Sequence, residues 1–314
     1  MIKTYWRPNS KIVESDLKAL KSKRVVWVDC FNPTDKELET ISTHTKVSVS
    51  DFKEHLISYE RPNTFEFDNY SLIVFGVPVI HDKIVKRTSF AIFLFNNKNI
   101  ITLRTEEISG ITSFGKDLIE KNPKYFDSHT KVVRVMLEKI VNDYFDMLDN
   151  FQETADKIET SIFHKPQERA IEEVFRLKKS LLLFHKSLLA NREVITAIEK
   201  EYVSKLSRKE LYEFRDIYND LVQLVDAEET LRDILTGVID IYMTSISNNL
   251  NNIIKKLTVV ASYVLIPTLI ASIYGMNFRF MPEIPWKWGY PFSLGLMILS
   301  IVAVYYYFRR AKML

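Results

Sequence analysis

Apolar and polar residues in the first 125 positions alternate as they do in a mixed α/β domain. Segment 25–29 is a short β-rich run, and segments 71–80 and 89–95 are longer ones. A polar tetrapeptide joins the last run to segment 100–104, and this spacing predicts a β-hairpin. We therefore expect a sheet in this part of the chain.

One helix in the same region is marked by its N-terminal sequence. Thr34 is followed three residues later by Glu37. This is the spacing of a capping box, in which each side chain bonds the backbone N–H of the other residue. The pattern predicts a helix that begins here and runs toward His44.

After Pro123 the apolar spacing changes to that of long helices. The first is expected to continue to about Phe163. Pro166 then interrupts it, because proline disrupts a helix interior but is tolerated in the first turn. Further helices are expected over residues 167–201 and 208–276. Residues 126–256 are thus expected to form a helical domain and stalk.

The last of these helices carries an apolar stripe that steps by three, four or seven residues. Its members are Leu211, Ile217, Leu221, Leu224, Leu231, Leu235, Val238, Tyr242, Ile246, Leu250 and Ile253. At ~1.5 Å per residue the helix would be roughly 100 Å long. A helix of this length needs partners along most of its apolar face. A soluble three-helix bundle is the alternative interpretation of the segment.

Two segments near the end of the chain carry no charge. Residues 257–276 and 291–308 comprise twenty and eighteen residues without Asp, Glu, Lys or Arg. A helix needs ~20 apolar residues to cross the ~30 Å hydrocarbon layer of a bilayer. Each segment is therefore expected to span a membrane. The loop between them, residues 277–290, is short enough to make them a hairpin.

Basic residues predict the orientation of this hairpin. Lys255 and Lys256 precede the first span, and a basic tail, residues 309–314, follows the second. Lys and Arg favour the cytoplasmic side, so both chain ends are expected in the cytoplasm and the loop outside the plasma membrane. Arg279 and Lys287 in the loop run against the rule. The large charged N-terminal part, which has no evident export signal, supports it.

Composition narrows the range of functions. Residues 251–314 hold seven basic side chains and one acid, Glu283, so the rest of the chain is slightly acidic and nucleic acid is a poor candidate partner. The single cysteine, Cys30, permits no intrachain disulfide. No histidine has metal-ligand spacing to another histidine or to Cys30, and there is no Gly-rich phosphate loop. The sequence thus indicates neither an enzyme nor an organic cofactor.

Polar side chains of the first span gather on one face. At ~100° per residue the following positions fall within an arc of roughly 120°, namely Asn251, Thr258, Ser262, Leu265, Thr268, Ser272 and Met276. This arrangement suits a pore-lining helix, and packing of two helices through small polar residues is the alternative. Two helices cannot enclose a pore, so conduction would require several copies in a cyclic assembly.

None of the side chains on this face is charged, which bears on the choice of ion. Mg²⁺ gives up its water reluctantly and takes hard oxygen ligands. Rings of neutral amide and hydroxyl oxygens would hold the hydrated ion through its waters and still release it. A hydrated divalent cation is the expected cargo.

The end of the first span resembles the CorA magnesium-channel family. Residues 274–277 read Tyr-Gly-Met-Asn, and Met281-Pro282-Glu283 and a second span follow. The Gly-Met-Asn triplet at this place, after a long helical stalk, is the signature of that family. The similarity is dense from about residue 210 onward, while the N-terminal half matches mainly in the order of its elements.

The resemblance implies a funnel-shaped homopentamer. Each subunit would have an α+β cytoplasmic domain, a long helical stalk that continues into the pore-lining first span, and a second span in an outer ring. Gly275, Met276 and Asn277 would form the selectivity filter, with Asn277 as the outer ring and Gly275 supplying backbone freedom. Glu283 in the outer loop would concentrate cations or shape the loop.

The resemblance also implies the pore lining, which would consist of Asn251, Thr258, Leu265, Thr268 and Ser272. Asn251 would form a polar ring at the cytoplasmic mouth. Leu265 would form a hydrophobic constriction, and such rings gate by dewetting. The family often has glycine where Ser272 stands.

Control by cytoplasmic Mg²⁺ bound between neighbouring subunits is a further implication of the resemblance. Asp216 matches one ligand position, and Glu54, eight residues before Pro62, matches the opposing acid. Such a carboxylate pair repels when empty and is bridged by a divalent ion, which couples occupancy to subunit spacing. An unliganded acid on a helix surface is the alternative for Asp216.

The function predicted from the sequence is a channel for Mg²⁺, with Co²⁺ and Ni²⁺ as possible further cargo. One alternative is a zinc-transporting member of the same superfamily. The spans contain neither Cys nor His, the ligands that zinc prefers, and Met276 favours magnesium. The other alternative is a membrane-anchored coiled-coil scaffold that conducts no ions.

Overall fold

A computed structural model describes residues 1–8, 11–22, 24–56, 61–81, 84–120, 123–164, 168–279 and 281–311. The chain divides into two compact units, an N-terminal unit, Met1–Ile239, and a C-terminal unit, Asp240–Leu314. One helix, α6, contributes residues to both. The predicted interruption at Pro166 and the last three residues of the predicted basic tail lie outside the described residues.

The N-terminal unit is built on a sheet with the strand order β2-β1-β3-β7-β6-β5-β4. The strands are β1 (Ile2–Trp6), β2 (Val13–Ser15), β3 (Val26–Phe31), β4 (Asn63–Glu66), β5 (Tyr70–His81), β6 (Ile84–Phe95) and β7 (Asn99–Arg104). β3 and β7 pair in parallel and the other neighbours are antiparallel. The hairpin predicted between β6 and β7 is confirmed, and Lys98 in its turn has a left-handed φ of 70°.

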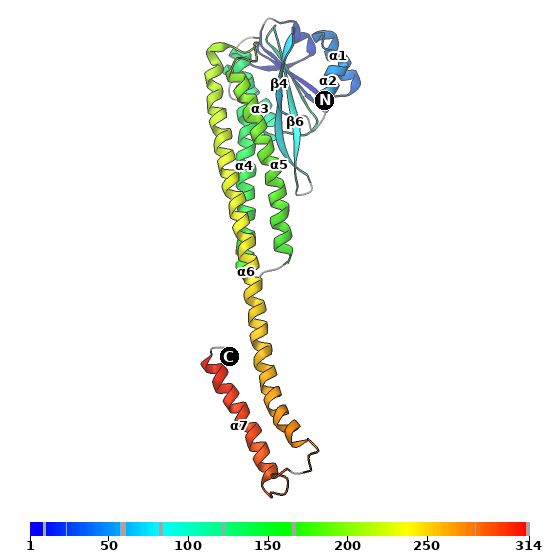
Figure 1. Ribbon diagram of the computed structural model, residues 1–314. Helices are drawn as coiled ribbons and strands as arrows, with labels where there is room; N and C mark the ends of the chain where they lie inside the picture. Colours follow the sequence, from blue (N-terminus) through cyan, green and yellow to red (C-terminus); the bar gives the residue numbers. More distant parts are fainter. Residues whose placement is uncertain are drawn as a thin grey trace. The chain divides into compact units, whose positions relative to one another are not determined.

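Helices lie on both faces of this sheet (Figure 1). On one face α1 (Asp35–Thr45) and α2 (Val49–Glu54) pack against a core that includes Val26, Val28 and Cys30 of β3. Because side chains alternate along a strand, Trp27 and Asp29 point to the other face, toward α3 (Ser109–Glu120). The expected α+β domain is therefore confirmed as a three-layer arrangement.

The predicted start of α1 is also confirmed. Thr34 is the N-cap, its Oγ1 accepts a hydrogen bond from the Glu37 N–H at 3.4 Å, and the Glu37 carboxylate accepts one from the Thr34 N–H at 2.8 Å. A capping box of this kind satisfies two helix-end donors that would otherwise lack intrahelical partners.

Long helices complete the N-terminal unit. They are α4 (His129–His164), α5 (Glu168–Glu199) and the first part of α6 (Phe214–Tyr274), which lie side by side in Figure 1. Short 3₁₀ turns occur at Leu17–Lys21, Pro123–Asp127 and Arg208–Glu213. The predicted apolar stripe is buried from Leu211, in the 3₁₀ turn before α6, to Tyr242, so this part of the helix packs against the rest of the chain. The alternative of a soluble bundle for the whole segment is not supported, because α6 continues into an exposed apolar stretch.

A buried hydrogen-bond network ties the helices to the sheet. The Gly76 N–H of β5 donates to Asn191 Oδ1 of α5 at 2.8 Å, and the Gly76 carbonyl accepts from Asn191 Nδ2 at 2.9 Å and from Tyr144 Oη of α4 at 3.0 Å. A Cβ at Gly76 would lie 3.4 Å from Asn191 Oδ1 of α5 and 3.1 Å from Pro62 Cγ. Glycine therefore lets strand, α4 and α5 meet closely.

The C-terminal unit contains the end of α6 and α7 (Gly289–Arg310). Both helices are long and apolar enough to cross a membrane, by length and composition. They contact each other through a small cluster of Val259, Val304 and Phe308, with Tyr263 and Ile266 beside it. Most of their other large apolar side chains are exposed, as in Leu257 at 67% and Leu299 at 66%.

Candidate ion pathway and metal site

The polar face predicted for the first span is exposed in this chain. Asn251, Thr258, Thr268 and Ser272 are exposed and Leu265 is 70% exposed. None of these side chains is covered by α7, which contacts Val259, Tyr263 and Ile266. At ~100° per residue, the centre of the polar face lies roughly 120° around the helix from those contact positions. Helix packing within the chain therefore does not account for the polar face.

The hydroxyl groups of this face share one hydrogen-bond geometry. Thr258 Oγ1 donates to the Ile254 carbonyl at 2.9 Å, Ser262 Oγ to the Thr258 carbonyl at 2.8 Å, and Thr268 Oγ1 to the Val264 carbonyl at 2.7 Å. Each hydroxyl proton is thus directed back along the helix. What these groups present outward is oxygen lone pairs, which accept hydrogen bonds from the water shell of a cation.

At the end of α6 the Gly-Met-Asn triplet closes the helix. The Gly275 N–H donates to the Ala271 carbonyl at 3.0 Å, and the Met276 N–H donates to the Ile273 carbonyl at 3.3 Å. Asn277 follows outside the helix with its side chain exposed. The expectation that Gly275 supplies unusual backbone freedom is wrong here. Its φ is not positive, and a Cβ would lie 3.4 Å from the Ala271 carbonyl oxygen, an ordinary contact.

The loop between α6 and α7 depends on a different glycine. A Cβ at Gly289 would lie 2.5 Å from the Glu283 carbonyl oxygen, which no side chain tolerates. The same carbonyl accepts a hydrogen bond from the Trp286 N–H at 3.3 Å. The Glu283 backbone thus shapes the loop, while its carboxylate is exposed. The sequence does not single out Gly289, because the contact with the Glu283 carbonyl arises from the fold of the loop.

Asp216, the predicted regulatory ligand, lies exposed in the first turn of α6. Asp220 stands one helical turn further on the same face, so the two carboxylates repel. Burial and, next, the charge of Asp216 raise the pKa of Asp220 above its ordinary value. The sequence reading did not include Asp220, which its i, i+4 spacing from Asp216 would have indicated.

Glu54, the predicted opposing acid, is the exposed last residue of α2. It lines a cavity of about 300 Å³ together with Asp51, His55, Asp68 and Tyr70. Burial and the charges of Asp51 and Glu54 raise the pKa of the Tyr70 hydroxyl. Three carboxylates, those of Asp51, Glu54 and Asp68, thus line this cavity.

The chain does not bring its two predicted regulatory acids together. α2 and the first turns of α6 lie on opposite sides of the N-terminal unit (Figure 1). Asp216 is not among the residues that line the cavity at Glu54. Within the described residues no group of three His, Cys, Asp or Glu side chains is arranged to hold a metal ion. An ion bound to both acids would have to lie between two copies of the chain.

Comparison with known proteins gives a consistent result. The family model described as "CorA-like Mg2+ transporter protein" matches residues 22–310. The cobalt/magnesium transport protein CorA of Methanocaldococcus jannaschii is 30% identical over 307 residues, which cover 96% of each chain. The protein of the same name from Thermotoga maritima is 30% identical over 258 residues, which cover 82% of this chain and 74% of that one.

The fold agrees with a solved full-length structure. The complete structure of the CorA magnesium transporter from Methanocaldococcus jannaschii superposes with a TM-score of 0.92 at 28% identity, covering 100% of this chain and 99% of the other. The architecture of an α/β domain, a long helix and two C-terminal apolar helices is therefore shared along the whole length.

Proposed function

This chain belongs to the CorA-like Mg²⁺ transporter family, and from that premise we propose that it is a membrane channel for Mg²⁺ and Co²⁺. Both ions appear in the names of its relatives in Methanocaldococcus jannaschii and Thermotoga maritima. The observation that carries the proposal is the exposed polar face of α6, which runs along an apolar helix, lies away from α7 and ends at Asn277.

The conducting unit is a homo-oligomer, a pentamer by the family resemblance, in the plasma membrane. The polar faces of several copies of α6 converge on one axis, because in lipid the outward oxygen lone pairs of these hydroxyls would meet no hydrogen-bond donor. Lys255 and Lys256 before the first span and Arg309 and Arg310 after the second favour cytoplasmic chain ends.

Each pore residue has a role that follows from its chemistry. Asn251, Thr258, Thr268 and Ser272 offer neutral oxygens to the waters of a hydrated cation. The rows of hydroxyl lone pairs support this role, since they accept hydrogen bonds from those waters without a fixed charge that would trap the ion. Leu265 narrows the path as an apolar ring.

Asn277 is the selectivity residue of this proposal. Its side chain is exposed beyond the last turn of α6, where a ring of amide oxygens would meet the ion before it enters the membrane. Gly275 and Met276 end the helix through backbone hydrogen bonds and so set the position of Asn277.

Cytoplasmic Mg²⁺ bound at Asp216 of one copy and Glu54 of a neighbour closes the channel. The mutual repulsion of Asp216 and Asp220, expressed in the raised pKa of Asp220, supports a cation-seeking surface on α6. The acidic surroundings of Glu54 supply a matching surface on α2. A bridging divalent ion neutralises both and holds two subunits at a fixed spacing.

The zinc alternative has less support. The relatives in Methanocaldococcus jannaschii and Thermotoga maritima bear cobalt/magnesium names, and one in Wolinella succinogenes bears a magnesium name. The described residues of the two spans also lack the sulfur and imidazole ligands of zinc. A non-conducting scaffold would give no reason for an uncovered polar face in lipid.

Flux into proteoliposomes tests the proposal. We expect the native chain to admit Mg²⁺ and Co²⁺, and Asn277→Ala to slow entry at least about tenfold, since a hydrogen bond to a charged species is worth about 1.5–3 kcal/mol. Asn252→Ala is the matched control, because this exposed amide lies outside the polar face. Equal rates for the two variants would contradict the selectivity role, and no flux from the native chain would favour the scaffold.

A further inference from the structure

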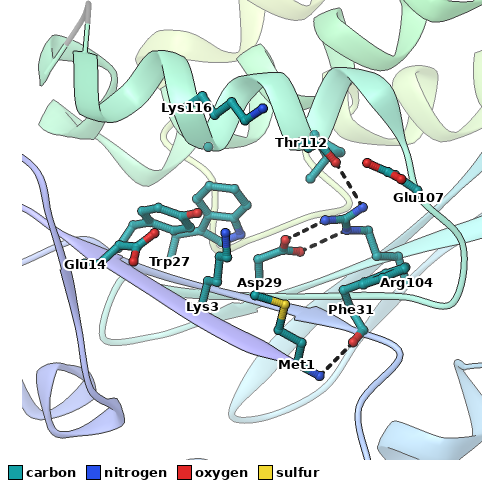
Figure 2. A pocket seen from close by; sticks show the side chains of 13 residues that line it. Met1, Lys3, Glu14, Trp27, Asp29, Phe31, Arg104, Glu107, Thr112 and Lys116 are labelled. Carbon is teal, nitrogen blue, oxygen red and sulfur yellow. Dashed lines mark hydrogen bonds and ion pairs between the residues drawn. The ribbon is translucent and has the colours of Figure 1, made fainter.

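A cavity of about 280 Å³ lies in the N-terminal unit, between α3 and the adjoining strands β1, β3 and β7 (Figure 2). It occupies the face of the sheet opposite α1 and α2. None of the residues assigned above to conduction or to Mg²⁺ control lines it. The channel function therefore gives this cavity no role.

The strand pattern places the cavity where α/β proteins commonly bind ligands. β3 and β7 are the parallel pair of the sheet, and Asp29 and Arg104 stand near their carboxyl ends. Ligands of α/β sheets tend to bind in the crevice outside the carboxyl ends of parallel strands. Here α3, which follows β7 after a short connection, forms the other wall with Thr112 and Lys116.

The floor of the cavity is a buried ion pair. Arg104 Nη2 donates to Asp29 Oδ2 at 2.8 Å and Arg104 Nε donates to Asp29 Oδ1 at 3.3 Å, with both side chains less than 10% exposed. Asp29 Oδ1 also accepts from Thr102 Oγ1 at 3.0 Å, and Thr102 Oγ1 accepts from Trp27 Nε1 at 2.9 Å. This chain of hydrogen bonds fixes the carboxylate, and the carboxylate fixes the guanidinium.

Some N–H groups of Arg104 form no hydrogen bond within the described residues. A guanidinium has five N–H groups. Two of them bond Asp29, and a third reaches Thr112 Oγ1 at 3.5 Å, the limit of a hydrogen bond. Among the described residues no further acceptor is bonded to it, so two N–H groups remain for a ligand. Arginine recognises carboxylate and phosphate oxygens with this planar arrangement of donors.

Two lysines stand over the floor. Lys3, from β1, and Lys116, from α3, both line the cavity. Figure 2 shows the amino group of Lys3 beside Trp27 and Asp29, and the side chain of Lys116 extended along α3 on the opposite wall. Both side chains are exposed, and neither forms an ion pair in the described part of the chain. Two elements far apart in the sequence thus each contribute a positive charge to the wall of the same cavity.

The acids of the cavity are either paired with Arg104 or lie at the edges of the cavity. Asp29 is already matched by Arg104. The charge of Glu14 acts on Tyr5. Burial, and then the charges of Glu14 and Asp29, raise the pKa of Tyr5 to about 12. Glu107 stands at the edge beside Thr112 and Arg104 (Figure 2). The side chains that line the cavity thus carry three positive charges, on Lys3, Arg104 and Lys116, and three negative charges, on Glu14, Asp29 and Glu107. Figure 2 shows Glu14 and Glu107 at opposite edges of the cavity, so an anion would bind between them, at the lysines and the unbonded N–H groups of Arg104.

We propose that this cavity binds a small anion that carries carboxylate or phosphate groups. Its oxygens would accept from the two spare N–H groups of Arg104 and from the ammonium groups of Lys3 and Lys116. The volume sets the size of the ligand, since it lies at the lower end of the ~300–1,000 Å³ typical of ligand pockets. A buried ion pair adds little to stability by itself, and positioning an arginine for an anion explains its presence.

Calorimetric titration of the purified full-length protein tests the proposal. Citrate and inorganic phosphate are the two probes, at ionic strength matched with sodium chloride. Metal is removed beforehand by gel filtration without a chelator, because chelators are themselves polyanions. We expect saturable binding of at least one probe, and the stronger of the two identifies carboxylate or phosphate as the preferred group.

Three variants locate the binding. Lys3→Ala with Lys116→Ala should weaken it at least about tenfold, because a charge-assisted hydrogen bond is lost at each position. Lys36→Ala with Lys124→Ala, which removes two exposed lysines elsewhere in the unit, should leave it unchanged. Glu107→Gln should strengthen it two- to threefold, roughly, by removing a repelling charge.

The alternative outcomes are distinct. Saturable binding of neither probe would overturn the proposal, as would an equal loss in the two double-lysine variants. Weaker binding after Glu107→Gln would also overturn it, because the cavity would then favour a cation. The readout is binding and not flux, so the result is independent of the proposed channel function.

Discussion

The two units of this chain differ in how far they bury their large apolar side chains. The N-terminal unit buries its large apolar side chains among themselves, as with Trp27, Phe52 and Phe93, which have no exposed surface. In the C-terminal unit Leu257, Leu265 and Leu299 are each about two-thirds exposed. Apolar residues exposed on this scale indicate a partner surface. For these helices the partners are lipid and further copies of the chain.

Helix α6 has buried apolar side chains in its first part and exposed ones in its last part. Leu224 and Leu235 near its start are fully buried within a bundle, while Leu250 and Ile253 near its end are more than half exposed. The apolar periodicity is the same on both sides of the boundary. What differs is whether other parts of the same chain pack against the helix. A repeat pattern does not specify this.

Truncation of leucines along α6 should give the largest contrast between the units. Leu224→Ala removes a fully buried side chain and should lower the free energy of unfolding by about 2–5 kcal/mol. Leu257→Ala should change the unfolding of the N-terminal unit by less than about 0.5 kcal/mol. Urea titration of the protein in detergent, followed by circular dichroism, measures both. Equal losses would show that the two parts of α6 have one environment.

A lysine substitution on an exposed face of α7, compared with one on α5, should distinguish a surface in lipid from a surface in water. Leu299→Lys introduces a charge near the middle of the second span, where insertion is expected to cost about 2.5–3.5 kcal/mol. Leu182→Lys, at a side chain of α5 that is 46% exposed, should be nearly neutral. The fraction of protein recovered in the membrane after expression reports the difference. Full membrane recovery of Leu299→Lys would argue that this face of α7 contacts water.

The smallest predicted effect is on the pH dependence of stability, and it arises from Asp216 and Asp220 on α6. Burial and then the charge of Asp216 raise the pKa of Asp220, so the folded chain holds the proton more tightly than the unfolded chain. Stability should therefore fall as the pH rises through the range just above the ordinary pKa of aspartate. Asp220→Asn should remove this slope and add about 0.2–0.5 kcal/mol at neutral pH, as expected for one repulsive i, i+4 pair.

Thermal unfolding without Mg²⁺, at several pH values, checks this expectation. Asp226→Asn, an exposed acid on the same helix, is the control and should leave the slope in place. A native chain whose stability rises over that pH range would contradict the assignment.

Local patterns in the sequence predicted the elements that depend on near neighbours. The capping box at Thr34, the hairpin between β6 and β7 and the long helices follow from spacing alone, and the structure confirms them. The stalk continues into the first span as predicted, although Pro267 lies inside α6. Proline is tolerated in membrane helices.

Elements that depend on distant partners were not predicted. β1 becomes a strand by pairing with β3, and β4 by pairing with β5, while the short α2 and α3 are held by the sheet. The ion pair of Asp29 and Arg104 joins residues 75 positions apart. Only the parallel register of β3 and β7 brings them together, and no local pattern encodes that register.

For the ion pathway the sequence indicated the polar face, because a helical period is local. It did not show that the hydroxyl protons turn back to the helix, nor that α7 covers a different face. It also assigned an unusual backbone to Gly275, whereas Gly289 is the glycine whose Cβ would clash. A motif identifies a residue type, and only the surrounding atoms show which property of it is used.

Cysteine accessibility tests the central claim most directly, and the native chain is a suitable background. Its one cysteine, Cys30, is fully buried, and burial raises the pKa of its thiol, so it should not react. Thr268→Cys and Ser272→Cys place a thiol on the polar face of α6. Val260→Cys places one on the lipid side. A charged methanethiosulfonate reagent is then applied to proteoliposomes during Co²⁺ entry.

The account predicts that the reagent blocks Co²⁺ entry through Thr268→Cys and Ser272→Cys and leaves Val260→Cys and the native chain unaffected. The same block in all three variants, or in Val260→Cys alone, would show that the polar face of α6 does not line the pathway.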